Sequence, residues 1–360
     1  MRFPEFSGEW ESVILKDIAD FQKERISSEL LDERTYISTE NILQNFEGVQ
    51  SANSIPANTN VIEYKESDIL LSNIRPYLKK VWFADRTGGC SADVFVLRSR
   101  SCEPKYLYYV IASDKFINYI MSGAKGVKMP RGDKKQMECF TFSIPAIAEQ
   151  KKISRLLHLL DERITTQNKI IEDLKKLKSA ISERLFKGIE GSFVLLSDIC
   201  DIVKGKQING ENLSESGNYY VMNGGTEPSG YYGDYNVDAN AISISEGGNS
   251  CGYVQFNTSP FWSGGHCYSI QNIADNVNNL YLYHYLKSNE DVIMKLRIGS
   301  GLPNIQKKDL AMFKIKVPAI EQQITISTFL SSLERKAEIE ERIQNAMLKE
   351  KQYLLHQMFI

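Results

Sequence analysis

The chain has 360 residues, 42% of them apolar and 24% charged, a composition that predicts a folded protein of two or three domains. A net charge of −2 argues against a simple basic nucleic-acid binder, so contacts with phosphates would have to come from local patches or from partners. No apolar run reaches the length of a membrane span, the first residues do not resemble a signal peptide, and the scattered cysteines form no CxxC pair. These features predict a reduced protein in the cytoplasm.

Residues 1–143 are expected to form a first globular domain. Strand-like segments alternate with Gly, Asn and Pro turns, and a short helix is expected at 104–121, which indicates an α+β fold. Two segments carry basic and hydrogen-bonding side chains suited to phosphates and base edges. The candidates are Asn73, Arg75, Tyr77 and Lys79 in the first segment and Lys125, Lys128 and Arg131 in the second. A solvated surface loop is the alternative for the second segment.

Residues 144–190 are expected to hold a long helix, which begins near Ala148, after Pro145, and ends near Lys187. Apolar residues recur at alternating spacings of four and three, the pattern of a heptad seam. The first seam consists of Ile153, Leu157, Leu160, Ile164, Gln167, Ile171 and Leu174. At 1.5 Å per residue, a helix of about 40 residues is roughly 60 Å long.

The rest of the chain repeats this order at a constant offset, with a second globular domain at 191–316 and a second long helix at 317–360. Residues 145–187 align with 318–360 without a gap, and the globular domains share a weaker repeat at the same offset. The second seam consists of Ile326, Leu330, Leu333, Glu340, Met347 and Leu354. Two similar units on one chain predict a pseudo-two-fold molecule, suited to a partner with two related halves such as duplex DNA.

Gln167 and Glu340 interrupt the two seams near the middle of each helix. If the helices pair in antiparallel fashion, the two side chains would face each other in a polar layer that fixes the register at some cost in stability. The alternative is that both lie at the edge of the seam and point to water.

The second globular domain carries a different set of polar side chains in turn-rich segments. Asn and Gln suit adenine edges, Glu suits the amino group of cytosine, and Lys suits phosphates, whereas tyrosines more often pack than contact bases. The candidates are Lys204, Lys206, Asn223, Tyr231, Glu246, Asn249, Ser300, Asn304 and Gln306.

Motifs that would indicate catalysis are missing from the sequence. It contains no phosphate-binding GxxxxGK[ST] or GxGxxG loop, no methyltransferase-type Asn-Pro-Pro-aromatic motif and no helicase motif. The glycine-rich stretch 247–252 precedes a strand and is expected to be a hairpin turn. Cys251, His266 and Cys267 could be considered as zinc ligands, but their spacing fits no common site, so structural burial is the preferred interpretation. The sequence therefore predicts recognition, with no catalytic residue, metal or cofactor of its own.

The whole chain resembles a specificity (S) subunit of a type I restriction-modification system. The resemblance rests on the globular–helix–globular–helix order, on the Pro145–Gln150 and Pro318–Gln323 starts of the long helices, on the DILLS-x-IRP segment, and on the Gly-x-x-Met/Leu-Pro loop before each helix. It implies two target-recognition domains, each reading one half of a bipartite asymmetric DNA site. It also implies that the two helices pair in antiparallel fashion as a ruler and dock two methyltransferase subunits.

The same resemblance implies that restriction (translocase) subunits join the assembly and that this chain is non-catalytic. S-adenosylmethionine and ATP would then belong to the adenine-methyltransferase and restriction partners. Because the two globular domains differ greatly in sequence, they should read different half-sites, about one helical turn or roughly 34–36 Å apart. Two alternatives remain: the recognition subunit of a fused restriction–methylation enzyme, and a coiled-coil scaffold whose globular domains bind proteins, which the near-neutral charge favours.

Overall fold

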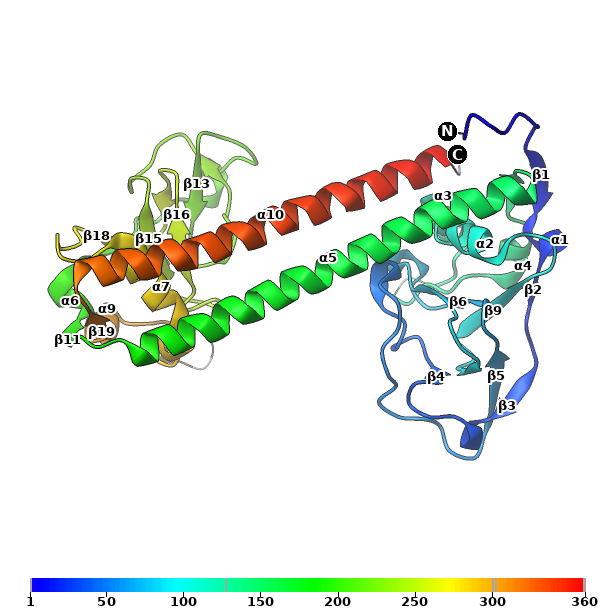
Figure 1. The fold of residues 1–360 in the computed structure, drawn as a ribbon, viewed down its shortest axis with the longest axis horizontal. Coiled ribbons are helices and arrows are strands. Elements are labelled where there is room, and N and C mark those ends of the chain that lie inside the picture. Colours follow the sequence, from blue (N-terminus) through cyan, green and yellow to red (C-terminus); the bar gives the residue numbers. More distant parts are fainter. Residues whose placement is uncertain (1, 127, 300, 302, 359–360) are drawn as a thin grey trace. The chain divides into compact units, whose positions relative to one another are not determined.

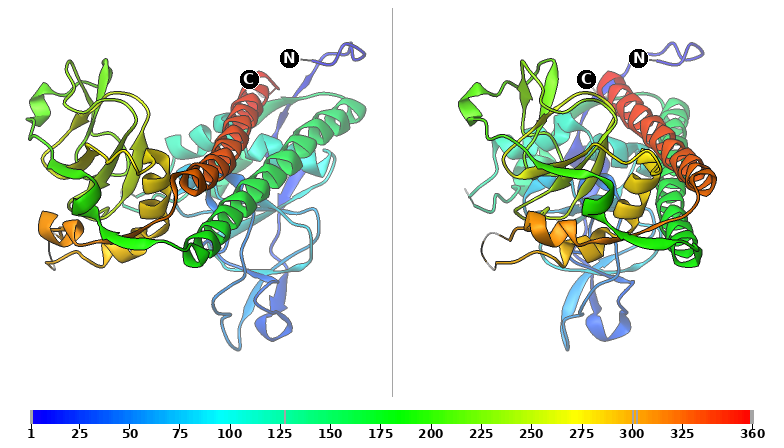
Figure 2. Two further views of the ribbon diagram at one scale, coloured as in Figure 1. Left: turned by 60° about the vertical axis from the view of Figure 1, so that its left-hand side comes forward. Right: turned by 90° about the vertical axis from the view of Figure 1, so that its left-hand side faces the viewer.

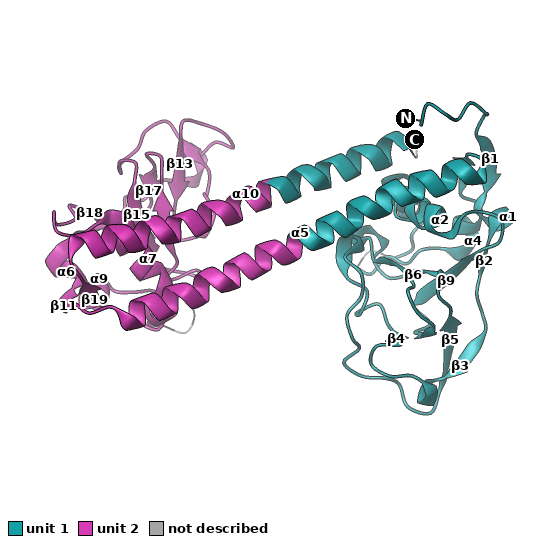
Figure 3. Ribbon diagram, viewed as in Figure 1, with its two compact units in different colours: residues 1–167, 343–360 teal, residues 168–342 magenta. Residues whose placement is uncertain are grey.

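The computed structural model describes residues 2–126, 128–299, 301 and 303–358. The chain divides into two compact units, which Figure 3 shows in teal and magenta: unit 1 is residues 1–167 with 343–360, and unit 2 is residues 168–342. The long helices are α5 (Ile147–Gly188) and α10 (Ile320–Met358), and each unit contains one end of both. Both appear as continuous ribbons, α5 in green and α10 in orange to red (Figures 1 and 2).

Unit 1 is an α+β domain that continues into the helix pair. Its strands are β1 (Glu11–Ile14), β2 (Ala19–Phe21), β3 (Arg25–Ser27), β4 (Tyr36–Ile37), β5 (Asn60–Tyr64), β6 (Ile69–Ser72), β7 (Val81–Phe83), β8 (Gly88–Cys90), β9 (Val94–Ser99) and β10 (Thr141–Ile144). Its shorter helices are α1 (Leu15–Ile18), α2 (Pro104–Ile111), α3 (Asp114–Ser122) and α4 (Lys134–Glu138), with 3-10 turns at Ser28–Leu30, Gln44–Phe46 and Pro76–Leu78. The sheets have the orders β2-β9-β6-β7 and β3-β5-β8-β4, and β1 pairs with β10.

Unit 2 repeats much of this plan. Its strands are β11 (Ser192–Leu195), β12 (Asp201–Lys204), β13 (Tyr219–Met222), β14 (Tyr231–Tyr232), β15 (Ala241–Ser245), β16 (Val254–Asn257), β17 (Trp262–Ser263), β18 (Cys267–Gln271) and β19 (Lys314–Val317). Its shorter helices are α6 (Leu196–Ile199), α7 (Asn279–Ser288), α8 (Glu290–Met294) and α9 (Lys307–Ala311), with a 3-10 turn at Gly210–Asn212. The sheet β12-β18-β15-β16 matches β2-β9-β6-β7, and β11 pairs with β19 as β1 pairs with β10.

The repeat extends to strand register. Ile69 pairs with Leu97 in unit 1, and Ile242 pairs with Ile270 in unit 2, at the offset of the sequence repeat. The predicted hairpin at 247–252 is confirmed, because it joins the antiparallel strands β15 and β16. The single helix expected at 104–121 is wrong: the chain breaks at Ser113, whose hydroxyl accepts a hydrogen bond from the backbone of Phe116 and caps a second helix, α3.

The two long helices run antiparallel within each unit. In unit 1, Lys351 Nζ of α10 lies 2.5 Å from Asp161 Oδ1 of α5. In unit 2, Lys178 and Lys175 of α5 form ion pairs with Glu334 and Glu341 of α10, so residue numbers fall along one helix as they rise along the other. The buried seam residues are Ile153, Leu157, Ile164, Gln167, Ile171, Ile326, Leu330 and Leu354, and the half-buried ones are Leu160, Leu174, Leu333, Glu340 and Met347.

The burial of Gln167 contradicts the alternative in which this side chain points to water. Gln167 belongs to unit 1 and Glu340 to unit 2, so the polar layer between them stays a prediction. Within the described part of the chain, no helix combines the length and apolar character needed to cross a membrane.

The start of each long helix is tied to the globular domain by a buried glutamine. Gln150 Nε2 donates to the carbonyl of Pro145 at 2.7 Å, and its Oε1 accepts from the backbone of Glu103, the N-cap of α2, at 2.9 Å. The first turn of a helix has backbone N–H groups without a partner inside the helix. The repeated Pro-to-Gln spacing in the sequence thus places an amide oxygen where it can accept from such a group.

The equivalent glutamine of unit 2 makes the same pair of contacts. Gln323 Nε2 donates to the carbonyl of Pro318 at 2.8 Å, and its Oε1 accepts from the backbone of Asn278, the N-cap of α7, at 2.8 Å. The same motif therefore joins the strand, the long helix and the globular domain in both units.

A second repeated contact joins each domain to both long helices. Tyr109 of α2 donates to Asp161 Oδ2 at 2.8 Å, and Asp161 is also paired with Lys351. In unit 2, Tyr283 of α7 donates to Glu334 Oε1 at 3.0 Å, and Lys178 pairs with the same oxygen at 2.6 Å. Burial and the neighbouring carboxylate raise the pKa of both tyrosines, so they remain hydrogen-bond donors.

Candidate nucleic-acid interface

The two predicted segments of unit 1 lie side by side. Ile74 and Arg131 form a β-bridge, Arg75 N donates to Pro130 O at 2.8 Å, and Gly132 N donates to Asn73 O at 3.2 Å. The described residues of 72–80 and 125–133, here called the first loop pair, therefore lie together. Arg75 adopts a left-handed backbone with φ of 51°, and its side chain is exposed.

Acidic neighbours pair with three cations of the first loop pair. Arg131 Nη1 lies 3.1 Å from Asp93 Oδ1, and Lys125 Nζ lies 2.9 Å from Asp133 Oδ2. The hydrogen bond from Lys125 lowers the pKa of Asp133, with help from backbone donors. Because these ion pairs lie in solvent, they are weak and open to exchange with phosphate oxygens. Lys79 is paired with Asp114, whereas Lys128 and Tyr77 are exposed.

Unit 2 contains the same loop pair, built by the same backbone contacts. Gly247 and Asn304 form a β-bridge, Gly248 N donates to Pro303 O at 3.0 Å, and Ile305 N donates to Glu246 O at 2.8 Å. Each contact lies at the offset of the sequence repeat from its counterpart in unit 1. We call residues 245–252 and 298–306, within the described chain, the second loop pair. Its side chains differ from those of the first, with Glu246 at the position of Asn73.

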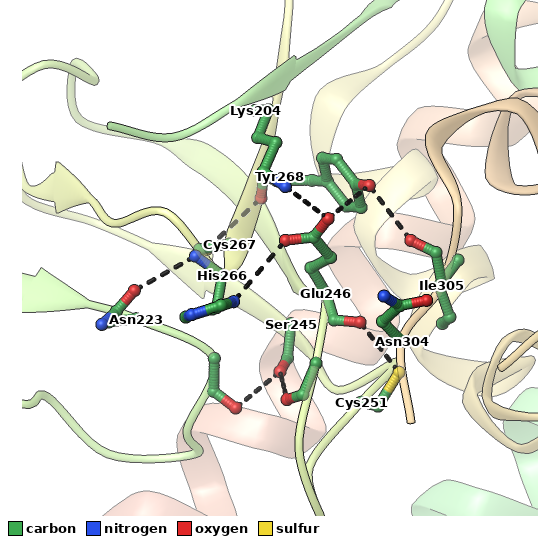
Figure 4. Close-up of polar contacts among 12 residues, drawn as sticks. Lys204, Asn223, Ser245, Glu246, Cys251, His266, Cys267, Tyr268, Asn304 and Ile305 are labelled. Carbon is green, nitrogen blue, oxygen red and sulfur yellow. Dashed lines mark hydrogen bonds and ion pairs between the residues drawn. The ribbon is translucent and has the colours of Figure 1, made fainter. Parts of the chain in front are cut away.

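Glu246 is the centre of the second loop pair (Figure 4). It is 7% exposed, and its Oε1 accepts from Lys204 Nζ at 2.7 Å and from the hydroxyl of Tyr268 at 3.1 Å. The Tyr268 hydroxyl also lies 3.0 Å from the carbonyl of Ile305, so its single proton is shared between Glu246 and the loop. Burial, followed by the charge of Glu246, raises the pKa of Tyr268. The other carboxylate oxygen, Oε2, points toward His266, whose Nδ1 is 3.9 Å away.

Two further candidates of unit 2, Asn223 and Asn304, lie near this carboxylate (Figure 4). Asn223 Oδ1 accepts from the backbone of His266 at 3.1 Å, and Asn304 Oδ1 accepts from Gln306 Nε2 at 3.2 Å. Asn249 is exposed at the hairpin.

Two candidates stand apart from that group. Lys206 bonds through its backbone to Ser263 and Trp262, and Tyr231 pairs with Tyr220 in another sheet. Ser300 lies outside the described residues.

The residues considered as zinc ligands have other partners. Cys251 Sγ donates to the carbonyl of Glu246 at 3.0 Å, and Cys267 is buried, which raises the pKa of its thiol to about 11. Across the described residues, no cluster of three or more His, Cys, Asp or Glu side chains could hold a metal. Tyr268 and His266 were not predicted as parts of a polar site. A tyrosine in a buried strand carries no sequence signal that separates it from a packing residue.

The comparisons with known proteins identify the family. A family model described as the type I restriction modification DNA specificity domain matches the chain twice, over residues 7–176 and 190–349. The chain therefore belongs to this family.

Two curated relatives and one solved structure agree with this assignment. A Mycoplasma pneumoniae protein described as a type I specificity subunit is 32% identical over 145 residues, or 40% of this chain and 38% of that protein. The type I restriction enzyme MjaVIII specificity subunit of Methanocaldococcus jannaschii is 27% identical over 241 residues, or 60% of this chain and 54% of that protein. Each match thus spans less than two thirds of the relative's length.

The solved type-I restriction-modification S subunit from M. genitalium superposes with a TM-score of 0.72 at 18% identity, over 98% of this chain and 96% of that one. This likeness concerns the fold, which it shows to be shared along nearly the whole chain.

Proposed function

We propose that this chain is the DNA-sequence-recognition subunit of a type I restriction-modification assembly. It reads a bipartite asymmetric DNA site, one half with residues 1–143 and the other with residues 191–316. The observation that carries the proposal is the pair of equivalent loop pairs. The same backbone hydrogen bonds present Asn73 with Arg131 in one unit and Glu246 with Asn304 in the other. A constant frame with different base-reading side chains suits two different half-sites.

The chemistry of the assembly belongs to its partners in this proposal. The chain itself is non-catalytic, and methyltransferase subunits, which modify adenine with S-adenosylmethionine, dock on the two long helices, residues 144–190 and 317–360. Because those helices repeat the same sequence pattern, they offer equivalent docking surfaces to two copies of one partner. ATP-dependent restriction subunits join this core. The assembly works on chromosomal and invading DNA in the cytoplasm.

A protein-binding scaffold explains the repeat and the helices but not the loop pairs. Its best support is the net charge of −2. In the first loop pair, however, Lys125 and Arg131 are paired with carboxylates while Arg75 and Lys128 are exposed, so a chain with near-neutral net charge still offers local cations to phosphates.

The test is a domain replacement. The chain is co-expressed with its cognate methyltransferase in a host that lacks other DNA methylation, and methylated bases are mapped across the genome. We expect a bipartite motif with a fixed spacer. Replacement of residues 1–143 by the first domain of another family member should change one half of the motif only.

Two results would contradict the proposal. Absence of any bipartite motif with a soluble, methyltransferase-bound wild-type chain would exclude sequence recognition. A replacement that alters both halves would exclude independent reading. The matched control is the reciprocal replacement of residues 191–316, which should alter the other half.

A further inference from the structure

We propose that residues 73 and 246 are equivalent base-reading positions, at which Glu246 accepts a hydrogen bond from the amino group of a cytosine and Asn73 pairs with an adenine. This inference rests on the proposed function, because it assigns one base of each half-site to one side chain. It goes further by naming the base and the atom that reads it.

The equivalence of the two positions is structural. The carbonyl of residue 73 accepts from Gly132 N at 3.2 Å, and the carbonyl of residue 246 accepts from Ile305 N at 2.8 Å. Each residue follows the central strand of its sheet, β6 or β15, and precedes a residue that bridges to the second loop segment. Both side chains therefore leave the chain at the same place, where a strand gives way to the loop pair.

Both positions also hold a side-chain oxygen that lacks a hydrogen bond. Among the described residues, neither Asn73 Oδ1 nor Glu246 Oε2 has a hydrogen-bond partner, although both atoms are buried. An unpaired carboxylate oxygen inside a protein costs free energy, so its retention calls for an explanation. The 3.9 Å from Glu246 Oε2 to His266 Nδ1 is beyond hydrogen-bond distance. A donor from outside would satisfy this atom.

Access to Glu246 depends on two exposed side chains. The side chain of His266 is 63% exposed and that of Lys204 is 54% exposed, and both point toward the carboxylate (Figure 4). Exposed side chains exchange rotamers on the picosecond to nanosecond scale, so a rotation of the His266 ring uncovers Oε2 at little cost. Lys204 and Tyr268 meanwhile hold Oε1 in place, which orients the free oxygen.

The arrangement selects cytosine over adenine. In the major groove cytosine presents an isolated amino donor, whereas adenine places its N7 acceptor beside the amino group. Glu246 offers a single negatively charged acceptor, which would repel that N7. An amide offers one acceptor and one donor, which match the N6 and N7 of adenine. Asn73 supplies this pair of groups at the equivalent position of unit 1.

The decisive variant is Glu246→Gln, which is isosteric. Because Lys204 and Tyr268 both donate to Oε1, the amide oxygen must take that place, and the amide NH₂ must replace Oε2. The free group then changes from acceptor to donor, so cytosine is no longer matched. Guanine and thymine, which present acceptors, become the matched bases. Asn73→Asp is the complementary variant, since it removes the donor and should weaken the preference for adenine in the other half-site.

The experiment maps methylated motifs for each variant co-expressed with the methyltransferase. The wild-type motif should contain a cytosine in the second half-site. In Glu246→Gln, methylation of sites with that cytosine should fall at least about fivefold relative to sites with guanine or thymine, which corresponds to the lower end of the free energy of one base contact. All other positions should stay unchanged. The control is Glu290→Gln in the same unit: Glu290 is also mostly buried and paired with Lys287 at 2.6 Å, but its hydrogen bonds go to Lys287 and to the backbone of Val254 in β16, outside the loop pair. Its motif should equal that of wild type.

The outcomes separate this inference from the proposed function. A bipartite wild-type motif that stays identical in Glu246→Gln and in Asn73→Asp would overturn the base assignment and leave DNA recognition intact. Suppose that Glu246→Gln loses methylation at all sites and melts at a lower temperature, and that Asn73→Asp leaves its half-site unchanged. Glu246 would then have a structural role only, and the base assignment would be overturned. No wild-type motif at all would contradict the proposed function itself.

Discussion

The buried amide of Gln323 provides the sharpest test of how the recognition domain is attached to the long helix. Its side chain makes hydrogen bonds to Pro318 O at 2.8 Å, Asn276 O at 3.0 Å and Asn278 N at 2.8 Å, and it is fully buried. Gln323→Ala would leave three backbone groups without partners. At about 1–3 kcal/mol for each buried group, the loss is on the order of 3–6 kcal/mol, because partial hydration after truncation limits the total.

The assay is thermal unfolding followed by circular dichroism, with amide hydrogen exchange at the first turn of α7. A domain of this size loses about 2–4 °C of melting temperature per kcal/mol, so we expect a fall on the order of 10 °C. The matched control is Gln322→Ala, because Gln322 is the exposed neighbour in the same helical turn. If Gln323→Ala melts within about 1–2 °C of that control, with unchanged exchange at Asn278, the amide does not hold the junction and the reasoning fails.

Three further predictions concern the loops, the pH response and the helices. In the methyltransferase-bound complex, Lys125→Ala and Lys128→Ala should each lower the salt slope of DNA binding by about one unit, as expected for phosphate contacts. Arg131→Ala should instead reduce the discrimination at one base position by about 1–3 kcal/mol. Wild-type affinity and salt slope in all three variants would exclude this loop from the interface. Burial lowers the pKa of His284 to about 4. The unfolded state therefore binds a proton at this histidine below about pH 6.5, whereas the folded state binds it only below about pH 4. Stability should therefore fall as the pH drops through this window, by up to about 3 kcal/mol, and His284→Asn should show a shallower fall in melting temperature; parallel curves for the two proteins would count against this. Insertion of one heptad into both α5 and α10 should lengthen the spacer of the methylated motif without altering either half-site, and an unchanged spacer would refute the ruler.

The long helices and the repeat could be predicted from sequence because their signals are local. Heptad spacing and the Pro-to-Gln start are readable within a few turns, and the helix bounds at Ile147 and Gly188 lie next to those expected. The break at Ser113 does have a local signal, because the polar residues Ser113, Asp114 and Lys115 separate two apolar stretches, and the expectation of a single helix gave that signal too little weight.

The arrangement of the candidate site could not be predicted in the same way. The sequence identified Asn73 and Arg131 as separate candidates far apart along the chain, and only the fold makes their segments neighbours. The role of Glu246 was assigned from its chemistry alone. Its contacts with Tyr268 and Lys204 depend on strands β18 and β12 lying beside each other, which no local pattern specifies.

Near-neutral charge and DNA recognition become compatible once the local pairing of charges is considered. In the first loop pair, Lys125 and Arg131 already have carboxylate partners, Asp133 and Asp93, so a phosphate must compete for them. Those carboxylates also repel the DNA backbone, which weakens binding to any sequence. Specificity is a difference between affinities, so a repulsion that acts on every sequence alike leaves it unchanged, and the discrimination must come from the base contacts. A chain that relies on methyltransferase partners for phosphate contacts can therefore use its own loops mainly to select bases.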